Sequence, residues 1–224
     1  MGSTYNVSDR PAPLVVFDLD GTLVDSADTI YQTIRESLRR MNVEATITPE
    51  TIRPFIGAHF KDIFAALRVN VDADDFLAVY KKRYFDYIDS SSLYPDALET
   101  LDRLRDAGYM TALLTTKMQS QADRIVELFG LDRRLDYTLG RRDGLPLKPD
   151  PAPLRLIVNE LGADMARTAM CGDTEYDVGC AQNAGAVALA ASYGFRTRDE
   201  LLRLAPDRVY DRLAELPDIL AERF

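Results

Sequence analysis

The feature that most constrains the fold is a set of four short apolar segments spread along the chain. They begin at Leu14, Tyr109, Thr168 and Ala186 and read LVVF, YMTALL, TAMC and AVALAA. Runs with almost no polar residue among the apolar ones are typical of strands that are covered on both faces, as in a parallel sheet. A chain of 224 residues, 46% of them hydrophobic, is long enough to bury such a sheet.

Helical patterns lie between these predicted strands. Leu98, Leu101 and Leu104 recur at helical spacing before Gly108, and a similar stripe ends at Gly130. Glycine directly after an apolar stripe is typical of a helix C-terminus. The repeated order of helix, glycine and strand predicts βα units, and therefore an α/β core built on a parallel sheet.

Residues 27–90 break this alternation, because they contain several amphipathic helical patterns and no convincing strand. We interpret them as an all-helical insertion into the α/β core, with borders near Asp25 and Leu93. The predicted domains are a core and a helical module, formed respectively by residues 1–25 with 93–224 and by residues 26–92.

The charge balance limits the partners that the chain can bind. It has 36 acidic and 27 basic residues, a net charge of −9 and a pI of about 4.7. A polyanion such as nucleic acid would meet a repulsive field, so we expect no nucleic-acid partner. A small anionic substrate stays possible, since a bound cation and a few fixed donors can outweigh the global field locally.

Cysteine content and hydropathy bear on the compartment. Cys171 and Cys180 are the only cysteines, and both lie among apolar or small residues, which indicates reduced interior thiols. The start of the chain has no apolar segment of the signal-peptide kind, and no stretch approaches about 18 apolar residues. We therefore expect a cytoplasmic protein without a membrane span.

Polar residues with catalytic potential follow the predicted strands. In an open parallel sheet, ligands bind outside the carboxyl ends of the strands. The residues at those positions, or just before the next helix, are Asp18, Asp20, Thr115, Thr116, Lys148, Asp173 and Asp177.

The aspartates in this set indicate a metal site. Asp18 and Asp20 project to the same side if the strand geometry continues past Phe17, and two such close carboxylates resist ionisation unless a cation lies near. Asp173 and Asp177 add carboxylates at another strand end. Oxygen ligands with a single histidine in the chain favour Mg²⁺ over zinc.

Lys148 and Thr115 complete the chemistry that these residues suggest. A lysine ammonium suits a phosphate oxygen, and a threonine hydroxyl is a hydrogen-bond donor. Together with the carboxylates and a metal they form a set suited to phosphoryl transfer through an aspartyl-phosphate. Each residue alone also has an ordinary structural explanation, such as an Asp-Gly turn or a helix N-terminus, so the prediction depends on their joint placement.

At these residues the chain resembles the haloacid dehalogenase superfamily of aspartate-nucleophile phosphatases, and within it the phosphoglycolate phosphatase-like branch. The segments FDLDGTLVDS, LLTTK, KPDP and GDTEYD are similar to its four motifs, in the same order. The resemblance extends over nearly the whole chain from Leu14. It implies a three-layer Rossmann-like core with a helical cap inserted after the first motif.

The resemblance also implies roles for individual residues. Asp18 would be the nucleophile, and Asp20 would protonate the leaving group and then activate water. Thr115 and Lys148 would bind phosphate. Magnesium would be held by Asp18, the Asp20 carbonyl and Asp173, with Asp177 in support. Thr116 stands where many relatives have asparagine, so we expect a backbone N–H contact to phosphate there.

Substrate selection is expected to lie with the helical module. Its segment IRPFIGAHFKDIF resembles the part of such caps that reaches the active site, which makes His59 and Lys61 candidates for substrate contact. A histidine at a helix start and a lysine on a solvated helix face are the alternative explanations.

The leading hypothesis is a magnesium-dependent phosphatase acting on a small phosphorylated metabolite, with phosphoglycolate favoured. A phosphosugar mutase of the β-phosphoglucomutase kind would share the core motifs. A binding or regulatory protein that lost turnover is the non-enzyme alternative, and the intact motif residues argue against it. Dehalogenase chemistry is disfavoured because the magnesium pattern serves phosphoryl transfer. The sequence does not indicate an oligomeric state.

Overall fold

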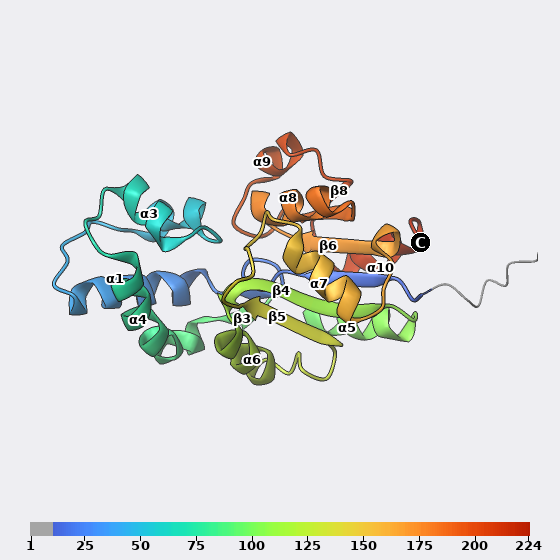
Figure 1. Ribbon diagram of the computed structural model, residues 1–224, viewed down its shortest axis with the longest axis horizontal. Coiled ribbons are helices and arrows are strands. Elements are labelled where there is room, and N and C mark those ends of the chain that lie inside the picture. The colour runs from blue at the N-terminus through green and yellow to red at the C-terminus, as the bar shows by residue number, and fades with distance from the viewer. Residues whose placement is uncertain (1–10) are drawn as a thin grey trace, which may run out of the picture.

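The protein is an α/β structure built on a six-stranded parallel sheet, seen in a computed structural model that describes residues 11–224 (Figure 1). The strand order is β5-β4-β1-β6-β7-β8. The strands are β1 (Leu14–Phe17), β4 (Met110–Met118), β5 (Tyr137–Arg141), β6 (Thr168–Gly172), β7 (Val187–Ala191) and β8 (Arg208–Tyr210). The predicted fold class is confirmed. Residues 1–10, part of the predicted core segment 1–25, lie outside the described residues.

Helices cover both faces of this sheet. They are α5 (Ala97–Asp106), α6 (Gln119–Leu128), α7 (Ala152–Glu160), α8 (Glu175–Ala184), α9 (Arg198–Arg203) and α10 (Leu216–Ala221), with short 3-10 turns η4 (Met165–Arg167) and η5 (Leu213–Glu215). Side chains alternate along β1, so Val15 and Phe17 join a core that includes α5, α6 and α10, whereas Leu14 and Val16 join one that includes α7 and α8. The result is a three-layer core.

All four strands predicted from apolar runs are present. The strand β5 was not predicted. It lies at the edge of the sheet and reads YTLGR, in which only Leu139 and Gly140 are buried. An edge strand has no neighbour on one side and needs no continuous apolar run.

The segment between β1 and β4 leaves and re-enters the core through a two-stranded antiparallel ribbon, β2 (Val24–Asp25) paired with β3 (Ser92–Leu93). Between these strands the chain is helical and lies beyond one end of the sheet (Figure 1). The helices are α1 (Ala27–Arg40), α2 (Pro49–Ile52), η2 (Arg53–Phe55), α3 (Phe60–Leu67), α4 (Ala73–Arg83) and η3 (Tyr84–Ser90). The division into two domains at Asp25 and Leu93 stays a prediction.

Aromatic side chains form much of the interior of the helical module. Phe60, Phe64, Phe76, Tyr80 and Tyr84 contact one another with ring centroids 4.6–5.9 Å apart. Such tilted and edge-to-face pairs add to the hydrophobic gain of burying the rings. These aromatics help to hold α3 and α4 together above the carboxyl ends of the strands.

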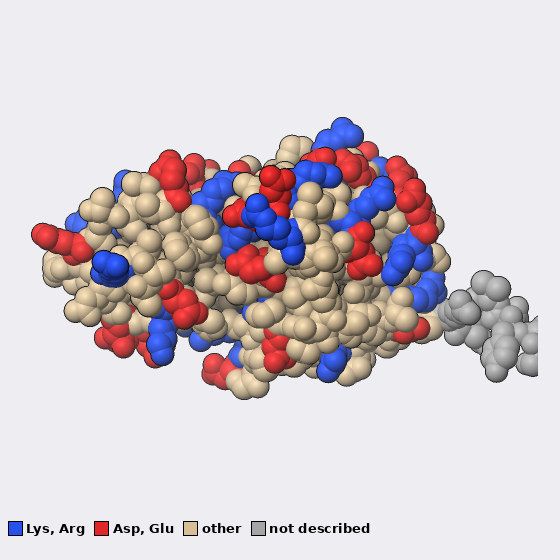
Figure 2. All heavy atoms as spheres, turned by 90° about the horizontal axis from the view of Figure 1, so that it is seen from above, with Lys and Arg blue, Asp and Glu red and all other residues tan. Residues whose placement is uncertain are grey.

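The remaining expectations concern the surface and the cysteines. Cys171 and Cys180 are free and buried. Within residues 11–224 no helix is long and apolar enough to cross a membrane. Acidic and basic side chains are interspersed on the face shown in Figure 2. A cytoplasmic location stays a prediction.

Candidate active site

The site lies at the carboxyl end of β1, beside the carboxyl end of β6 and the second half of β4. Phe17 is in register with Leu113 of β4 and Cys171 of β6. The next residue, Asp18, still donates its backbone N–H to the Cys171 carbonyl, at 2.8 Å. The parallel register therefore places the Asp18 carboxylate at the carboxyl edge of the sheet, between the ends of two neighbouring strands.

Lys148 is the central cation of the site. Its Nζ lies 2.7 Å from Asp18 Oδ1, 2.5 Å from Asp177 Oδ1 and 3.0 Å from the Leu114 carbonyl oxygen. Burial alone would lower the pKa of Lys148, but Asp177 and Asp18 outweigh it and raise that pKa. Lys148 is therefore a buried, charged bridge between the first and fourth motifs and not a solvated surface lysine.

Asp18 is buried, yet one of its oxygens is available. Lys148 occupies Oδ1, whereas Oδ2 accepts no hydrogen bond from residues 11–224. Asp18 also lines the cavity described below. Asp18 Oδ2 therefore has free lone pairs, and the ion pair between Oδ1 and Lys148 restrains the orientation of the carboxylate.

Asp173 is fully buried and held by two donors. The Thr22 hydroxyl donates to Oδ1 at 3.1 Å, and the Phe195 backbone N–H donates to Oδ2 at 2.7 Å. Gly21, with φ of 84°, approaches so closely that an added Cβ would lie 2.7 Å from Asp173 Cγ. Glycine is required there both for the backbone conformation and for the space.

Asp177 has two functions in the structure. Its Oδ2 accepts the Thr174 backbone N–H at 3.0 Å and the Thr174 hydroxyl at 2.7 Å, which forms the capping box of α8. Its Oδ1 binds Lys148. Asp177 therefore caps α8 and also contacts Lys148, while its predicted support of a metal site stays a prediction.

The three buried aspartates form a candidate metal centre. One oxygen from each of Asp18, Asp173 and Asp177 lies within 4.8 Å of the other two. Burial raises the pKa of Asp18 to about 7 against the opposing effect of Lys148, and burial together with Asp177 raises the pKa of Asp173. Three carboxylates against one nearby lysine leave excess negative charge, which fits a hard divalent cation such as Mg²⁺.

Asp20 lies outside this cluster and has its own partners. Lys117 Nζ is 2.9 Å from Asp20 Oδ2, and the Ser26 hydroxyl donates to Oδ1. Lys117 also lies over the Tyr84 ring, 4.3 Å from its centroid. The sequence reasoning gave Lys117 no role. The available signal was its position two residues after Thr115 in an extended strand, which places both side chains on one face.

The two threonines of the second motif occupy different positions. Thr115 is buried, its Oγ1 accepts the Lys117 backbone N–H at 3.2 Å, and it lines a small pocket together with Lys148. Thr116 lines the main cavity with Asp18 and Asp20. Both therefore lie close to the predicted phosphate position, Thr116 with direct access to the cavity.

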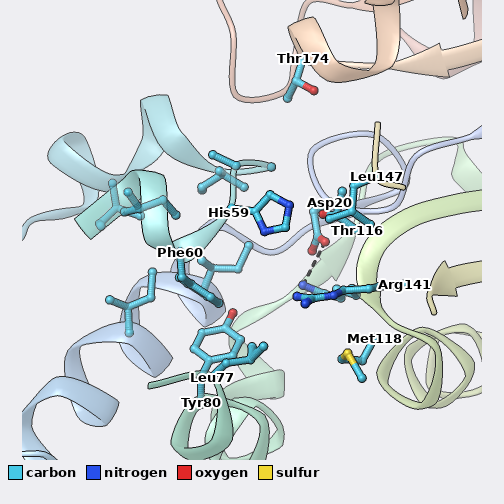
Figure 3. Close-up of a pocket in the computed structure, with 18 of the residues that line it drawn as sticks. Asp20, His59, Phe60, Leu77, Tyr80, Thr116, Met118, Arg141, Leu147 and Thr174 are labelled. Carbon is cyan, nitrogen blue, oxygen red and sulfur yellow. Dashed lines mark ion pairs between the residues drawn. The ribbon is translucent and has the colours of Figure 1, made fainter. Parts of the chain in front are cut away.

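A cavity of about 110 Å³ lies between the core and the helical module, and Figure 3 shows its lining. The core supplies the aspartates of the first motif and the end of β4, and the helical module supplies mainly apolar side chains. His59 points into this cavity near Asp20 (Figure 3). Lys61 is exposed and lines a neighbouring groove along α3 instead. His59 also lines that groove, so of the two predicted specificity residues only His59 borders the cavity that contains Asp20.

A second contact joins the helical module to the core beside the site. Arg53 Nη2 donates to the Gly194 carbonyl oxygen at 2.5 Å, and its guanidinium lies over the Phe195 ring. Arg196 donates to the Arg53 carbonyl oxygen at 3.4 Å and also binds Glu175. These contacts hold η2 against the loop that buries Asp173.

The sequence matches the family of haloacid dehalogenase-like hydrolases over residues 15–191, which is more than half of the chain. The chain belongs to this family. Among its relatives are a phosphoglycolate phosphatase of Mesorhizobium japonicum, 30% identical with 94% of this chain and 96% of the relative covered, and the pyrophosphatase PpaX of Bacillus velezensis, 28% identical with 94% and 97% covered.

Solved structures of the family agree in fold. The crystal structure of a predicted phosphoglycolate phosphatase from Haemophilus somnus has a TM-score of 0.80 and 26% identity, covering 93% of this chain and 97% of that one. The predicted membership of the phosphoglycolate phosphatase-like branch is confirmed, and with it the enzyme class, a phosphatase of the haloacid dehalogenase superfamily.

Proposed function

We propose that the protein is a magnesium-dependent phosphatase that hydrolyses a small phosphate monoester, with phosphoglycolate favoured, through an aspartyl-phosphate on Asp18. The observation that supports this most is the free Oδ2 of Asp18, a residue that lines the cavity, is paired with Lys148 through Oδ1 and is clustered with the other two buried aspartates. The size of the cavity favours a small substrate, and the relatives include enzymes named phosphoglycolate phosphatase.

The first half of the proposed reaction transfers the phosphoryl group to the enzyme. Asp18 Oδ2 attacks phosphorus, the bond from phosphorus to the leaving oxygen breaks, and Asp20 gives that oxygen a proton. Lys148 and Thr116 would contact the phosphoryl oxygens. Asp18, Asp173 and Asp177 would hold Mg²⁺, which when bound neutralises charge on the phosphoryl group and favours ionised Asp18.

The second half releases phosphate. Asp20 takes a proton from a water molecule as that water attacks phosphorus, and the bond to Asp18 Oδ2 breaks, which regenerates both carboxyl groups. Lys117 and Ser26 hold the Asp20 carboxylate in place for both steps. The helical module above the site limits entry of other water.

Pyrophosphate is a second candidate substrate, because several relatives are named pyrophosphatase and the same two steps would cleave it. A mutase of the β-phosphoglucomutase kind stays an alternative. The similarity to a structure described as a β-phosphoglucomutase, at 18% identity, concerns the fold alone.

Phosphate release from a panel of substrates tests the proposal. The panel contains phosphoglycolate, pyrophosphate, sugar phosphates, nucleotides and p-nitrophenyl phosphate, each with and without magnesium. We expect activity only with magnesium, no turnover by Asp18→Asn, and a loss of roughly 10²- to 10⁴-fold in Asp20→Asn. Isomerised sugar phosphate without free phosphate would favour the mutase, and substantial turnover by Asp18→Asn would exclude the proposed nucleophile.

A further inference from the structure

Arg141 is a basic residue of the cavity that the reaction above does not use. It is the last residue of the edge strand β5, at the same carboxyl edge of the sheet as Asp18. It is half-buried and lines the cavity with Asp20 and His59. Figure 3 shows its guanidinium directed into the cavity beside Asp20, on the core side.

The guanidinium of Arg141 differs from the other cation of the cavity in having no anionic partner. Lys117 is engaged by Asp20 at 2.9 Å. Among residues 11–224, no carboxylate oxygen lies within 4.0 Å of an Arg141 nitrogen, and its side chain makes no hydrogen bond. By contrast, Arg105, Arg134 and Arg196 are each paired with a carboxylate.

An unpaired guanidinium at a cavity wall is suited to an anion that enters the cavity. Arginine binds carboxylate and phosphate oxygens through a planar fork of N–H donors, and such charge-assisted bonds are stronger than neutral ones. The opposite wall, from the helical module, is largely apolar, with Ile52, Ile56 and Leu77 among its residues. The polar side chains of this wall are His59 and Tyr80, and neither has the planar fork of N–H donors that Arg141 has.

We propose that Arg141 binds a second anionic group of the substrate, a carboxylate or a further phosphate, next to the phosphoryl group that is transferred. The inference rests on the proposed function and names its substrate class: small phosphate esters or anhydrides that carry another negative charge close to the scissile bond. Phosphoglycolate and pyrophosphate both have this chemistry. Arg141 is then a specificity residue, and the aspartates perform the reaction without it.

Paired substrates test this assignment. Phosphoglycolate is compared with 2-hydroxyethyl phosphate, which has a neutral hydroxymethyl group in place of the carboxylate, and pyrophosphate is compared with methyl phosphate. In Arg141→Gln we expect kcat/KM for whichever anionic substrate is used to fall about 10- to 100-fold, mainly through KM. We expect kcat/KM for the neutral partners to change less than about twofold, and Arg141→Lys to restore part of the loss.

The neighbouring Arg142 offers a matched control. It is exposed and its Nε binds Gln119, so Arg142→Gln removes the same charge next to the site and is expected to leave the substrate preference unchanged. An equal loss on charged and neutral substrates in Arg141→Gln, or no loss on either, would overturn the assignment. The assignment would also be overturned if the wild-type enzyme had the same kcat/KM for the charged substrates as for their neutral partners.

Binding separates this inference from the proposed reaction. In the Asp18→Asn background, calorimetry with phosphoglycolate and 2-hydroxyethyl phosphate measures recognition without turnover. If Arg141→Gln weakens the binding of phosphoglycolate but not of 2-hydroxyethyl phosphate, the role of Arg141 is supported. This holds even if the wild-type protein releases no phosphate, a result that would contradict the proposed function but not the role of Arg141. Unchanged phosphoglycolate binding contradicts the role of Arg141 whatever the activity.

Discussion

Replacing Asp18 by asparagine is expected to stabilise the metal-free protein. Burial raises the pKa of Asp18 from 3.8 to about 7 although Lys148 opposes it. The folded protein thus binds the proton of the Asp18 carboxyl group more tightly than the unfolded chain does. The free energy of unfolding therefore decreases as pH rises from about 4 to about 7. At about 1.4 kcal/mol per pKa unit, the charged carboxylate costs on the order of 4 kcal/mol above pH 7. Asparagine does not carry this charge.

Thermal unfolding in EDTA measures the effect. Because a protein of this size shifts its Tm by roughly 2–4 °C per kcal/mol, Asp18→Asn is expected to melt about 8–16 °C above wild type at pH 8, with the gap closing toward pH 4. Asp132→Asn, at an exposed carboxylate, is the matched control and is expected to melt with wild type. A variant that melts at or below wild type at pH 8, or a gap independent of pH, would refute this reasoning.

Three further substitutions test the geometry. Lys117→Met removes the 2.9 Å ion pair with Asp20. We expect kcat to fall roughly 10-fold because the acid-base group is misplaced, and a wild-type kcat in steady-state assays would contradict this. Gly21→Ala places a Cβ against Asp173, so magnesium affinity by calorimetry is expected to drop about 10-fold or more, and unchanged affinity argues against the metal centre. Phe76→Ala empties a fully buried ring site and is expected to cost about 3–5 kcal/mol in urea unfolding, where a cost below about 1 kcal/mol would disagree with the packing.

The fold could be predicted largely because its central strands are buried on both faces. LVVF at Leu14 and TAMC at Thr168 have no solvent-facing side, so their composition alone distinguishes them from amphipathic helices. The edge strand β5 escaped prediction, because an edge strand can be short, polar and glycine-containing. Arg141 was missed with it, since a residue cannot be placed at a strand end before the strand is recognised.

Some features of the site could likewise be predicted from the sequence and others could not. Residues that follow recognisable strands, such as Asp18 and Asp173, could be placed at one rim from topology. Contacts that depend on side-chain reach could not. The ion pair between Lys117 and Asp20 requires the mutual position of β4 and the loop after β1. The access of His59, but not of Lys61, to the cavity depends on the orientation of α3 against the core.

The central claim is that Asp18 carries the phosphoryl group during turnover. Asp20→Asn is mixed with p-nitrophenyl phosphate and magnesium, because this leaving group needs little protonation while the second step still lacks its base. Mass spectrometry of the quenched and digested protein is expected to find one phosphoryl group on the peptide that contains Asp18. A phosphoryl group on another residue, or a full turnover of free phosphate with none on the enzyme, would contradict the account.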